Sequence, residues 1–233
     1  MAKDDFSQYV ITNKRKKYKF ANFDSFANCF SHFRDSESSQ TSESLTKYFG
    51  NNKLPLILEI AAGNAQFSLE LARRHSTYNF IAIDIKSDRL YTSAKRAMEE
   101  GVKNIVFLRT HINEIDKIFE EGSVDTVWLT FPDPFPKKRS AKHRLSHFKF
   151  LQQYRNILID TGSLKFKTDN RDLFLWSLEQ LVACNWHVSE LSFDLHESDL
   201  PDDYKIKTHY ETKFLSQGIP TNYCSATSAP DLS

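Results

Sequence analysis

The chain has little glycine and little cysteine. Only 6 of its 233 residues are glycine, whereas average proteins contain roughly 7%, and this excludes a collagen-like or glycine-linker protein. The three cysteines, Cys29, Cys184 and Cys224, lie far apart and form no Cys-x-x-Cys pair. A zinc ribbon and a thioredoxin-type motif are therefore excluded, and the lack of a disulfide framework favours a reducing compartment.

Long apolar segments are absent as well. No apolar run approaches the roughly 20 residues that span a bilayer, and the opening residues MAKDDFSQYV lack the apolar stretch of a secretory signal. The eight histidines are scattered, without the His-x-x-His or HExxH spacing that indicates a metal site. We therefore expect a cytoplasmic protein with no membrane partner and no metal.

The chain as a whole has almost no net charge, but individual segments of it are strongly basic. The 31 lysines and arginines and the 30 aspartates and glutamates give a net charge of +1. Residues 1–20 nevertheless carry six bases and two acids, and residues 134–159 carry seven bases and no acid. Such a run is usually a solvated face, but on the ligand side of a sheet it reads better as a phosphate-binding patch. The near-neutral total therefore does not exclude a nucleic-acid partner.

The pattern of apolar residues divides the chain into two parts. Residues 1–50 form a polar, basic N-terminal arm with short helices, and residues 51–233 form a domain in which apolar runs alternate with helical patterns. The runs predict strands at 56–60, 80–83, 105–108, 124–129, 164–167 and 186–193. This alternation predicts an α/β fold with a doubly wound, mostly parallel sheet. Ligands of such sheets bind beyond the carboxyl ends of the strands.

A cofactor site is indicated where the first two predicted strands end. Small residues and Gly63 follow the first strand, so a ligand can approach the backbone there. Asp84 lies about 20 residues further on, a spacing at which an acid accepts the ribose hydroxyls of an adenosine-containing cofactor. The alternative is tight packing at the turn and a helix cap at Asp84. A carboxylate at Glu59 would repel a pyrophosphate but suits a cationic methionine head, so S-adenosylmethionine fits better than NAD.

Two further acids follow predicted strands. Asp133 lies in F-P-D-P-F-P-K-K-R at 131–139, where three prolines fix the backbone and hold the carboxylate as a positioned acceptor. The alternative is a proline-rich surface loop. Asp169, in K-T-D-N at 167–170, can accept hydrogen bonds from a guanine edge or can cap the next helix. More polar groups gather in T-H-Y-E-T-K-F at 208–214.

Several motifs together point to one family. F-P-D-P-F-P-K-K-R, K-H-R-L, F-K-T-D-N, D-L-H and T-H-Y-E-x-K-F occur in this order, and residues 54–225 resemble the bacterial tRNA (guanine-N7)-methyltransferases. The resemblance implies a seven-stranded sheet of the Rossmann-like methyltransferase type. It also implies an enzyme, monomeric or homodimeric, that transfers the methyl group of S-adenosylmethionine to N7 of guanine 46 in the variable loop of tRNA.

The resemblance also implies a role for individual residues. Asp133 would be the catalytic residue at the junction of cofactor and substrate, and the basic run at 14–19 would contact the tRNA backbone. The residues implied to bind the cofactor are Glu59, Gly63, Asp84, His111 and Asp133. The residues implied to bind the substrate are Lys137, Asp169, Thr208, His209, Tyr210 and Glu211.

The sequence departs from the family pattern at a few positions. Ala61 and Ala65 replace two glycines of the cofactor turn, and alanine penalises a positive φ. Phe135 stands where tryptophan is common, and His111 stands where the family has an acid near the adenine, with Asn113 as the alternative residue there. These departures keep open a non-catalytic or weakened RNA-binding relative. A nucleotide-cofactor oxidoreductase is a second alternative, although the glycine-rich turn that it requires is absent.

Overall fold

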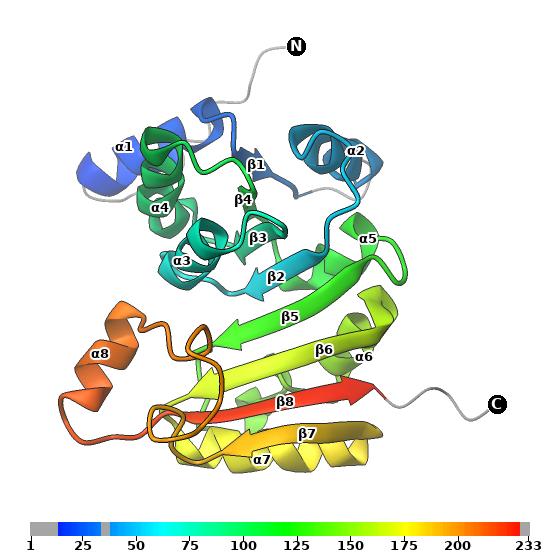
Figure 1. Cartoon of the computed structure of the whole chain (residues 1–233), viewed down its shortest axis with the longest axis vertical. Helices are drawn as coiled ribbons and strands as arrows, with labels where there is room; N and C mark the ends of the chain where they lie inside the picture. The colour runs from blue at the N-terminus through cyan, green and yellow to red at the C-terminus, as the bar shows by residue number, and fades with distance from the viewer. Residues whose placement is uncertain (1–13, 34–37, 229–233) are drawn as a thin grey trace.

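A computed structural model of the chain describes residues 14–33 and 38–228, without the side chains of residues 14–17 and 209. Its centre is an eight-stranded sheet with the strand order β1-β4-β3-β2-β5-β6-β8-β7 (Figure 1). The pairs from β1 to β6 are parallel, and β8 runs antiparallel to both β6 and β7. The strands are β1 (Cys29–Ser31), β2 (Leu56–Ile60), β3 (Asn79–Asp84), β4 (Ile105–Arg109), β5 (Val124–Thr130), β6 (Leu158–Thr168), β7 (Trp186–Ser192) and β8 (Asn222–Ser228).

The six predicted strands are all present, and the mostly parallel α/β sheet is confirmed. The sheet nevertheless has eight strands rather than the expected seven. The additional strand is β1, which comes from the segment that we assigned to the N-terminal arm and pairs with β4 through Cys29 and Phe107. The arm therefore contributes to the sheet instead of lying beside the domain.

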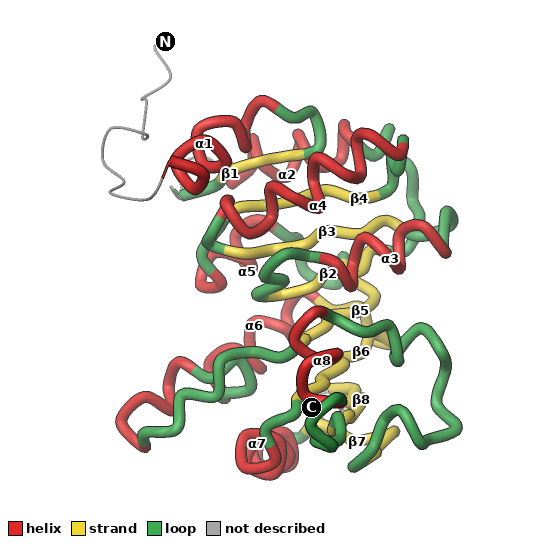
Figure 2. Tube along the Cα trace, turned by 90° about the vertical axis from the view of Figure 1, so that its left-hand side faces the viewer, coloured by secondary structure: helices red, strands yellow, loops and turns green. Residues whose placement is uncertain are grey.

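Helices cover both faces of the sheet (Figures 1 and 2). Strand residues alternate between the faces, so that Phe80 and Ala82 pack with α3 and α4, whereas Ile81 and Ile83 pack with α5, α6 and α7. The helices are α1 (Lys14–Asn22), α2 (Ser38–Tyr48), α3 (Gln66–Arg74), α4 (Ser87–Glu100), α5 (Ile115–Ile118), α6 (Phe148–Ile157), α7 (Arg171–Ala183) and α8 (His209–Leu215), with short 3-10 helices η2 (Phe23–Ser25), η4 (Ile112–Glu114) and η5 (Lys138–His143).

Local sequence signals account for the helix boundaries near the site. Helix α4 buries Leu90, Ala94 and Ala97 on one stripe and ends at Gly101, whose φ of 69° is the left-handed conformation that glycine adopts without strain. Helix α7 begins after Asn170, whose side chain accepts a hydrogen bond from the backbone N–H of Leu173 at 2.8 Å. The boundaries place the amino-terminal turns of both helices at the carboxyl edge of the sheet.

The arm is fastened to the domain by an arginine between two aromatic rings. The guanidinium carbon of Arg109, at the end of β4, lies 4.4 Å from the ring centroids of both Phe20 and Phe33. Such cation–π contacts contribute about 0.5–2 kcal/mol each, depending on burial. In addition, Lys19 Nζ donates to the hydroxyl of Thr92 on α4 at 2.7 Å. These contacts fix α1 beside α4, close to the carboxyl edge of the sheet.

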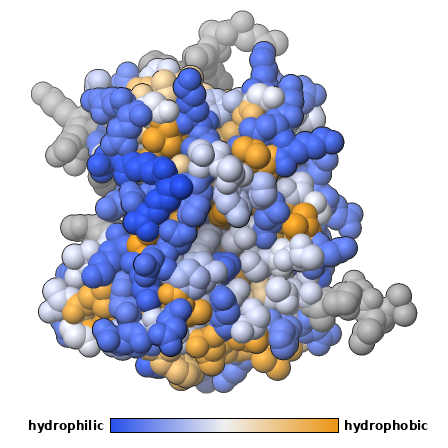
Figure 3. Space-filling view, viewed as in Figure 1, coloured by the Kyte–Doolittle hydropathy of each residue, from blue (hydrophilic) through white to orange (hydrophobic). Residues whose placement is uncertain are grey.

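Several apolar side chains are exposed at the end of the molecule that β7 and α7 form. At the β7 edge, Leu191 and Phe193 are exposed together with Leu175 and Val182 of α7, and Figure 3 shows apolar side chains gathered at this end of the molecule.

Within residues 14–33 and 38–228, no helix is both long and apolar enough to cross a membrane.

Candidate active site

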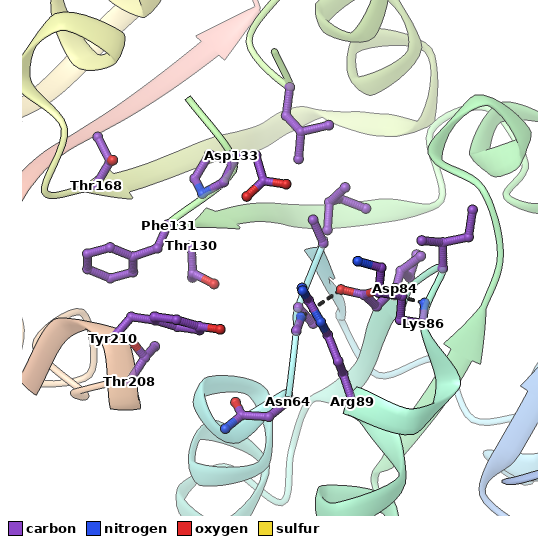
Figure 4. Close-up of a pocket in the computed structure, with 18 of the residues that line it drawn as sticks. Asn64, Asp84, Lys86, Arg89, Thr130, Phe131, Asp133, Thr168, Thr208 and Tyr210 are labelled. Carbon is purple, nitrogen blue, oxygen red and sulfur yellow. Dashed lines mark hydrogen bonds between the residues drawn. The ribbon is translucent and has the colours of Figure 1, made fainter. Parts of the chain in front are cut away.

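A cavity of about 450 Å³ lies at the carboxyl ends of β2, β3, β5 and β6, where parallel α/β sheets bind ligands. Residues from seven separate segments line it, including the segment after β4. Figure 4 shows lining residues around a common space, with Asp84 and Arg89 on one side and Thr208 and Tyr210 on the other. The lining residues that bear on the argument are Ala61, Gly63, Asn64, Asp84, Ile85, Arg89, Thr110, His111, Ile112, Asp133, Asp169, Thr208 and Tyr210.

In the turn after β2, every second residue from 61 to 65 has a positive φ. Ala61, Gly63 and Ala65 have φ values of 55°, 58° and 53°. The two alanines therefore occupy backbone positions that glycine would fill without strain, at a cost of about 1–2 kcal/mol each. At Gly63 an added Cβ would meet no atom within 4 Å, so this residue leaves open space beside the backbone. The turn after β2 therefore contains two alanines in a strained backbone conformation.

The structure places Glu59 behind this turn and not in the cavity. Its neighbours Leu58 and Ile60 face the opposite side of the sheet, so the alternation of β2 directs Glu59 toward α3. Its carboxylate accepts hydrogen bonds from the backbone N–H of Ser68 at 3.2 Å, and from the hydroxyls of Ser68 and Thr130 at 2.5 Å each. Burial raises the pKa of Glu59 against these hydrogen bonds. Ala65 precedes α3 and has no side chain that could cap the helix. Glu59, which we expected to bind the cofactor, caps α3 instead.

Asp84 lies at the end of β3 inside the cavity. One carboxylate oxygen accepts the N–H of Gly63 at 2.9 Å, and the other accepts the N–H of Lys86 at 2.8 Å. Burial raises the pKa of Asp84, while the two backbone hydrogen bonds and the charge of Arg89 oppose the shift. The acid therefore joins the turn after β2 to the start of α4 and also lines the cavity.

His111 and Asn113, the two alternatives for the adenine loop, have different surroundings. His111 lines the cavity, and its ring nitrogen accepts the N–H of Asn113 at 3.2 Å. The side chain of Asn113 instead accepts a hydrogen bond from Lys149 at 2.7 Å. Ile85 and Ile112 supply apolar surface beside His111. Of these two residues, His111 is therefore the one that lines the cavity.

The loop after β5 holds Asp133 on a strained backbone. Phe131 and Phe135 flank it with φ values of 50° and 43°, a conformation that costs roughly 1–3 kcal/mol in a bulky residue. The N–H of Phe131 donates to Lys167 O at 2.9 Å, which ties the loop to β6. Asp133 itself is exposed and points into the cavity (Figure 4).

Arg144 maintains this loop, a role that the sequence did not reveal. Its guanidinium donates to the carbonyl oxygens of Pro134 and Phe135 at 3.1 Å each and stacks on Trp176 at 4.5 Å. Arg144 is one of the seven bases at 134–159 for which the sequence predicts a phosphate-binding patch. Because Nε and one terminal nitrogen of Arg144 donate within the protein, the exposed lysines and arginines between β5 and α6 are Lys137, Lys138, Arg139 and Lys142. Lys137 lies outside the cavity.

Asp169 remains available at the end of β6. The cap of α7 is Asn170, so the alternative that Asp169 caps this helix is wrong. The side chain is half-buried, and burial raises the pKa of its carboxyl group. Asp169 and Asp133 thus line the same cavity from neighbouring strands.

Helix α8 brings Thr208 and Tyr210 to the cavity, but it turns Glu211 inward. Thr208 caps the helix, accepting the N–H of Glu211 at 3.1 Å. The Glu211 side chain has no exposure and accepts hydrogen bonds from Lys167 at 3.0 Å and His196 at 2.9 Å. We expected Glu211 to bind the substrate. Its side chain instead faces the interior, where Lys167 and His196 contact its two carboxylate oxygens. The side chain of His209 lies outside the described residues.

The order and direction of the strands define the Rossmann-like methyltransferase fold. Solved structures of this class have the same fold. An antibiotic-related methyltransferase has a TM-score of 0.59 and 15% identity, covering 81% of this chain and 94% of its own. The 16S rRNA methyltransferase KamB has a TM-score of 0.59 and 13% identity, covering 85% of this chain and 95% of its own.

The chain belongs to the tRNA (guanine-N7)-methyltransferase family. A family model described as a putative methyltransferase matches residues 53–223. The protein of that name from Cytophaga hutchinsonii is 39% identical over 180 residues, which are 76% of this chain and 81% of that protein. Its namesake from Bacteroides fragilis is 36% identical over 214 residues, 90% of this chain and 84% of that protein. The resemblance seen in the motifs is thereby confirmed.

Proposed function

We propose that the protein transfers the methyl group of S-adenosylmethionine to N7 of a guanine in tRNA, at position 46 of the variable loop. The observation that carries this proposal is that Asp84, Asp133 and Asp169 line one cavity. Asp84 accepts hydrogen bonds from the ribose of the cofactor, and Asp133 and Asp169 accept hydrogen bonds from the edge of the guanine. The relatives named above support tRNA as the substrate.

The cavity fits a nucleoside cofactor. Its volume of about 450 Å³ lies within the roughly 300–1,000 Å³ of small-molecule sites. The hydroxyl of Thr110 is buried at the cavity and, among the described residues, has no hydrogen-bond partner. Gly63 leaves the space that a Cβ would fill. Asp84 would accept hydrogen bonds from the ribose hydroxyls, and the hydroxyl of Thr110 would bond to a polar atom at the edge of the adenine. Ile85 and Ile112 would pack against the adenine ring.

The chemistry requires alignment rather than a base. S-adenosylmethionine supplies an electrophilic methyl group when bound. Guanine N7 carries an in-plane lone pair and no proton at neutral pH, so the chain does not need to deprotonate the nucleophile. Asp133 and Asp169 accept hydrogen bonds from N1–H and the amino group, which selects guanine by about 1–3 kcal/mol per base contact. The strained loop and its Arg144 contacts keep Asp133 in this orientation.

The exposed bases of the segment between β5 and α6 would bind the RNA backbone. Figure 2 shows this segment extending away from the sheet, and Lys138 and Arg139 are exposed on it. We expect the double variant Lys138→Gln/Arg139→Gln to lower the slope of log affinity for tRNA against log salt concentration. The decrease is about 0.7–0.9 per lost phosphate contact. Filter binding at several salt concentrations measures the slope.

A matched control removes the same charge elsewhere. Lys95 and Arg96 lie on α4 and pair with Glu99 and Glu100, so Lys95→Gln/Arg96→Gln is expected to leave the slope unchanged. Equal slopes for both double variants and the parent protein would mean that the segment before α6 is only a solvated face.

The activity itself is tested by incubating bulk tRNA with labelled S-adenosylmethionine and mapping the modified base. We expect label at N7 of guanine 46. Label at another atom would contradict the proposed acceptor. Absence of label, together with tRNA binding, would favour a non-catalytic RNA-binding protein. Thermal stabilisation by NADH but not by S-adenosylhomocysteine would favour an oxidoreductase.

A further inference from the structure

A second cavity adjoins the active site on the side of the N-terminal arm. Its volume is about 210 Å³, and it shares Gly63, Asn64, Arg89 and Tyr210 with the larger cavity. Its outer wall comes from α1, through Lys19, and from α4, through Asp88, Arg89 and Thr92. This cavity therefore lies between the N-terminal arm and the active site.

Two cations dominate its charge. Lys19 is held in place by its hydrogen bond to the hydroxyl of Thr92 at 2.7 Å. Arg89 lies in the first turn of α4, whose amino terminus adds a partial positive charge. Asp88 is the acid of the lining. Over the part of the chain that the structure describes, neither cation forms an ion pair with a carboxylate. The cavity is therefore suited to an oxyanion.

An aromatic ring connects this cavity with the active site. Tyr210 lines both cavities, and 55% of its surface is exposed. Exposed aromatic rings bind unstacked bases with little sequence preference. In Figure 4 the ring lies across the open space from Asn64 and Arg89. A base stacked on Tyr210 would therefore bring its phosphate toward Arg89 and Lys19.

We propose that the second cavity binds the phosphate of a nucleotide that flanks the target guanine, with the base of that nucleotide on Tyr210. The proposal rests on the proposed function, because it assumes that RNA enters the larger cavity. Lys19 is the last base of the run at residues 14–19, so further basic residues adjoin it in the sequence. A polyanion can use that charge beyond the cavity, whereas the single carboxylate of a methionine group cannot. The run therefore favours RNA as the source of the oxyanion.

The test uses Lys19→Gln in the full-length protein, because Lys19 lines the second cavity but not the larger one. We expect the affinity for tRNA to fall about tenfold at low salt, with a log–log salt slope smaller by about 0.7–0.9. The affinity for S-adenosylhomocysteine, measured by calorimetry, is expected to stay within about twofold. Lys95→Gln, a lysine of the adjacent α4, is the matched control and should change neither quantity.

Tyr210 provides a second variant. Tyr210→Ala is expected to weaken tRNA binding about fivefold or more, and Tyr210→Phe to retain it, because the base needs the ring and not the hydroxyl. Loss of S-adenosylhomocysteine affinity in Lys19→Gln with unchanged tRNA affinity would assign the cavity to the cofactor carboxylate and overturn the proposal. No change in either affinity would also overturn it.

Failure of the proposed function is recognised separately. If the parent protein methylates guanine N7 but Lys19→Gln binds tRNA normally, the phosphate site alone is wrong. If the parent protein neither binds nor methylates tRNA, both proposals are wrong.

Discussion

Replacement of Asp133 by alanine is expected to lower methyl transfer to tRNA at least 100-fold and to leave the protein folded. The carboxylate is exposed in the cavity, so its removal breaks no interior contact. The loop keeps its hydrogen bonds from Arg144 and from Phe131 to β6. The loss arises because guanine is no longer oriented with N7 toward the methyl group, and misplacement by about 1 Å can cost roughly 10²-fold.

The measurement is kcat and KM for tRNA together with the melting temperature. Asp133→Asn should retain part of the binding but not the turnover, since an amide offers one acceptor and adds two donors. Asp116→Ala removes an equal charge from the exposed surface of α5 and serves as the control. Turnover within threefold of the parent protein in Asp133→Ala would show that Asp169 alone orients the base.

Strands with continuous apolar runs could be predicted because both faces of a parallel sheet are buried. β8 could not, because its sequence N-Y-C-S-A-T-S has no such run. It is buried by its place between β6 and β7, with Phe166 opposite Cys224 on one side and Leu191 on the other. β1 was missed for a different reason, since three residues are too few to show a period.

The acidic residues of the site also fall into two groups, those whose place in the cavity could be predicted from the sequence and those for which this prediction failed. Asp84, Asp133 and Asp169 reach the cavity because the end of a strand determines where the next side chain lies. Glu59 and Glu211 do not, although each lies in or near a motif. Their partners are distant in sequence, as with Thr130 for Glu59 and Lys167 for Glu211. A pattern along the chain cannot show that a carboxylate is already used by such a partner.

An interior lysine fastens the wall that Thr208 and Tyr210 form. Lys167 is fully buried at the end of β6, and its ammonium donates to Tyr204 O at 3.0 Å, to Ile206 O at 2.7 Å and to Glu211 at 3.0 Å. Burial lowers the pKa of Lys167, and the charge of Glu211 opposes the shift. Burial raises the pKa of Glu211, but the hydrogen bond from His196 and the charge of Lys167 outweigh it, so this pKa lies below its usual range. The lowered pKa of Glu211 favours its carboxylate form beside the ammonium group of Lys167.

Lys167→Met is expected to lower the free energy of unfolding by about 3–5 kcal/mol, because it leaves Glu211 buried without its cation. The double variant Lys167→Met/Glu211→Gln removes both charges and should recover stability to within about 2 kcal/mol of the parent protein. Urea denaturation measures both values. Lys165→Met, two residues earlier on β6, is the control, since this lysine contacts Tyr204 and Trp128 instead of Glu211.

Activity separates positioning from stability. In the double variant the carbonyls of Tyr204 and Ile206 still lack their donor, so the segment before α8 loses two of its hydrogen bonds to β6 and keeps the contact of Lys165 with Tyr204. We expect kcat/KM for tRNA to stay at least tenfold below that of the parent protein, a loss of about 1.4 kcal/mol in transition-state stabilisation. Because Lys167 does not line the cavity, the affinity for S-adenosylhomocysteine should change less than twofold. Recovery of both stability and kcat/KM would show that the lysine only stabilises the fold, whereas recovery of stability alone identifies Lys167 as a positioning residue for the substrate wall.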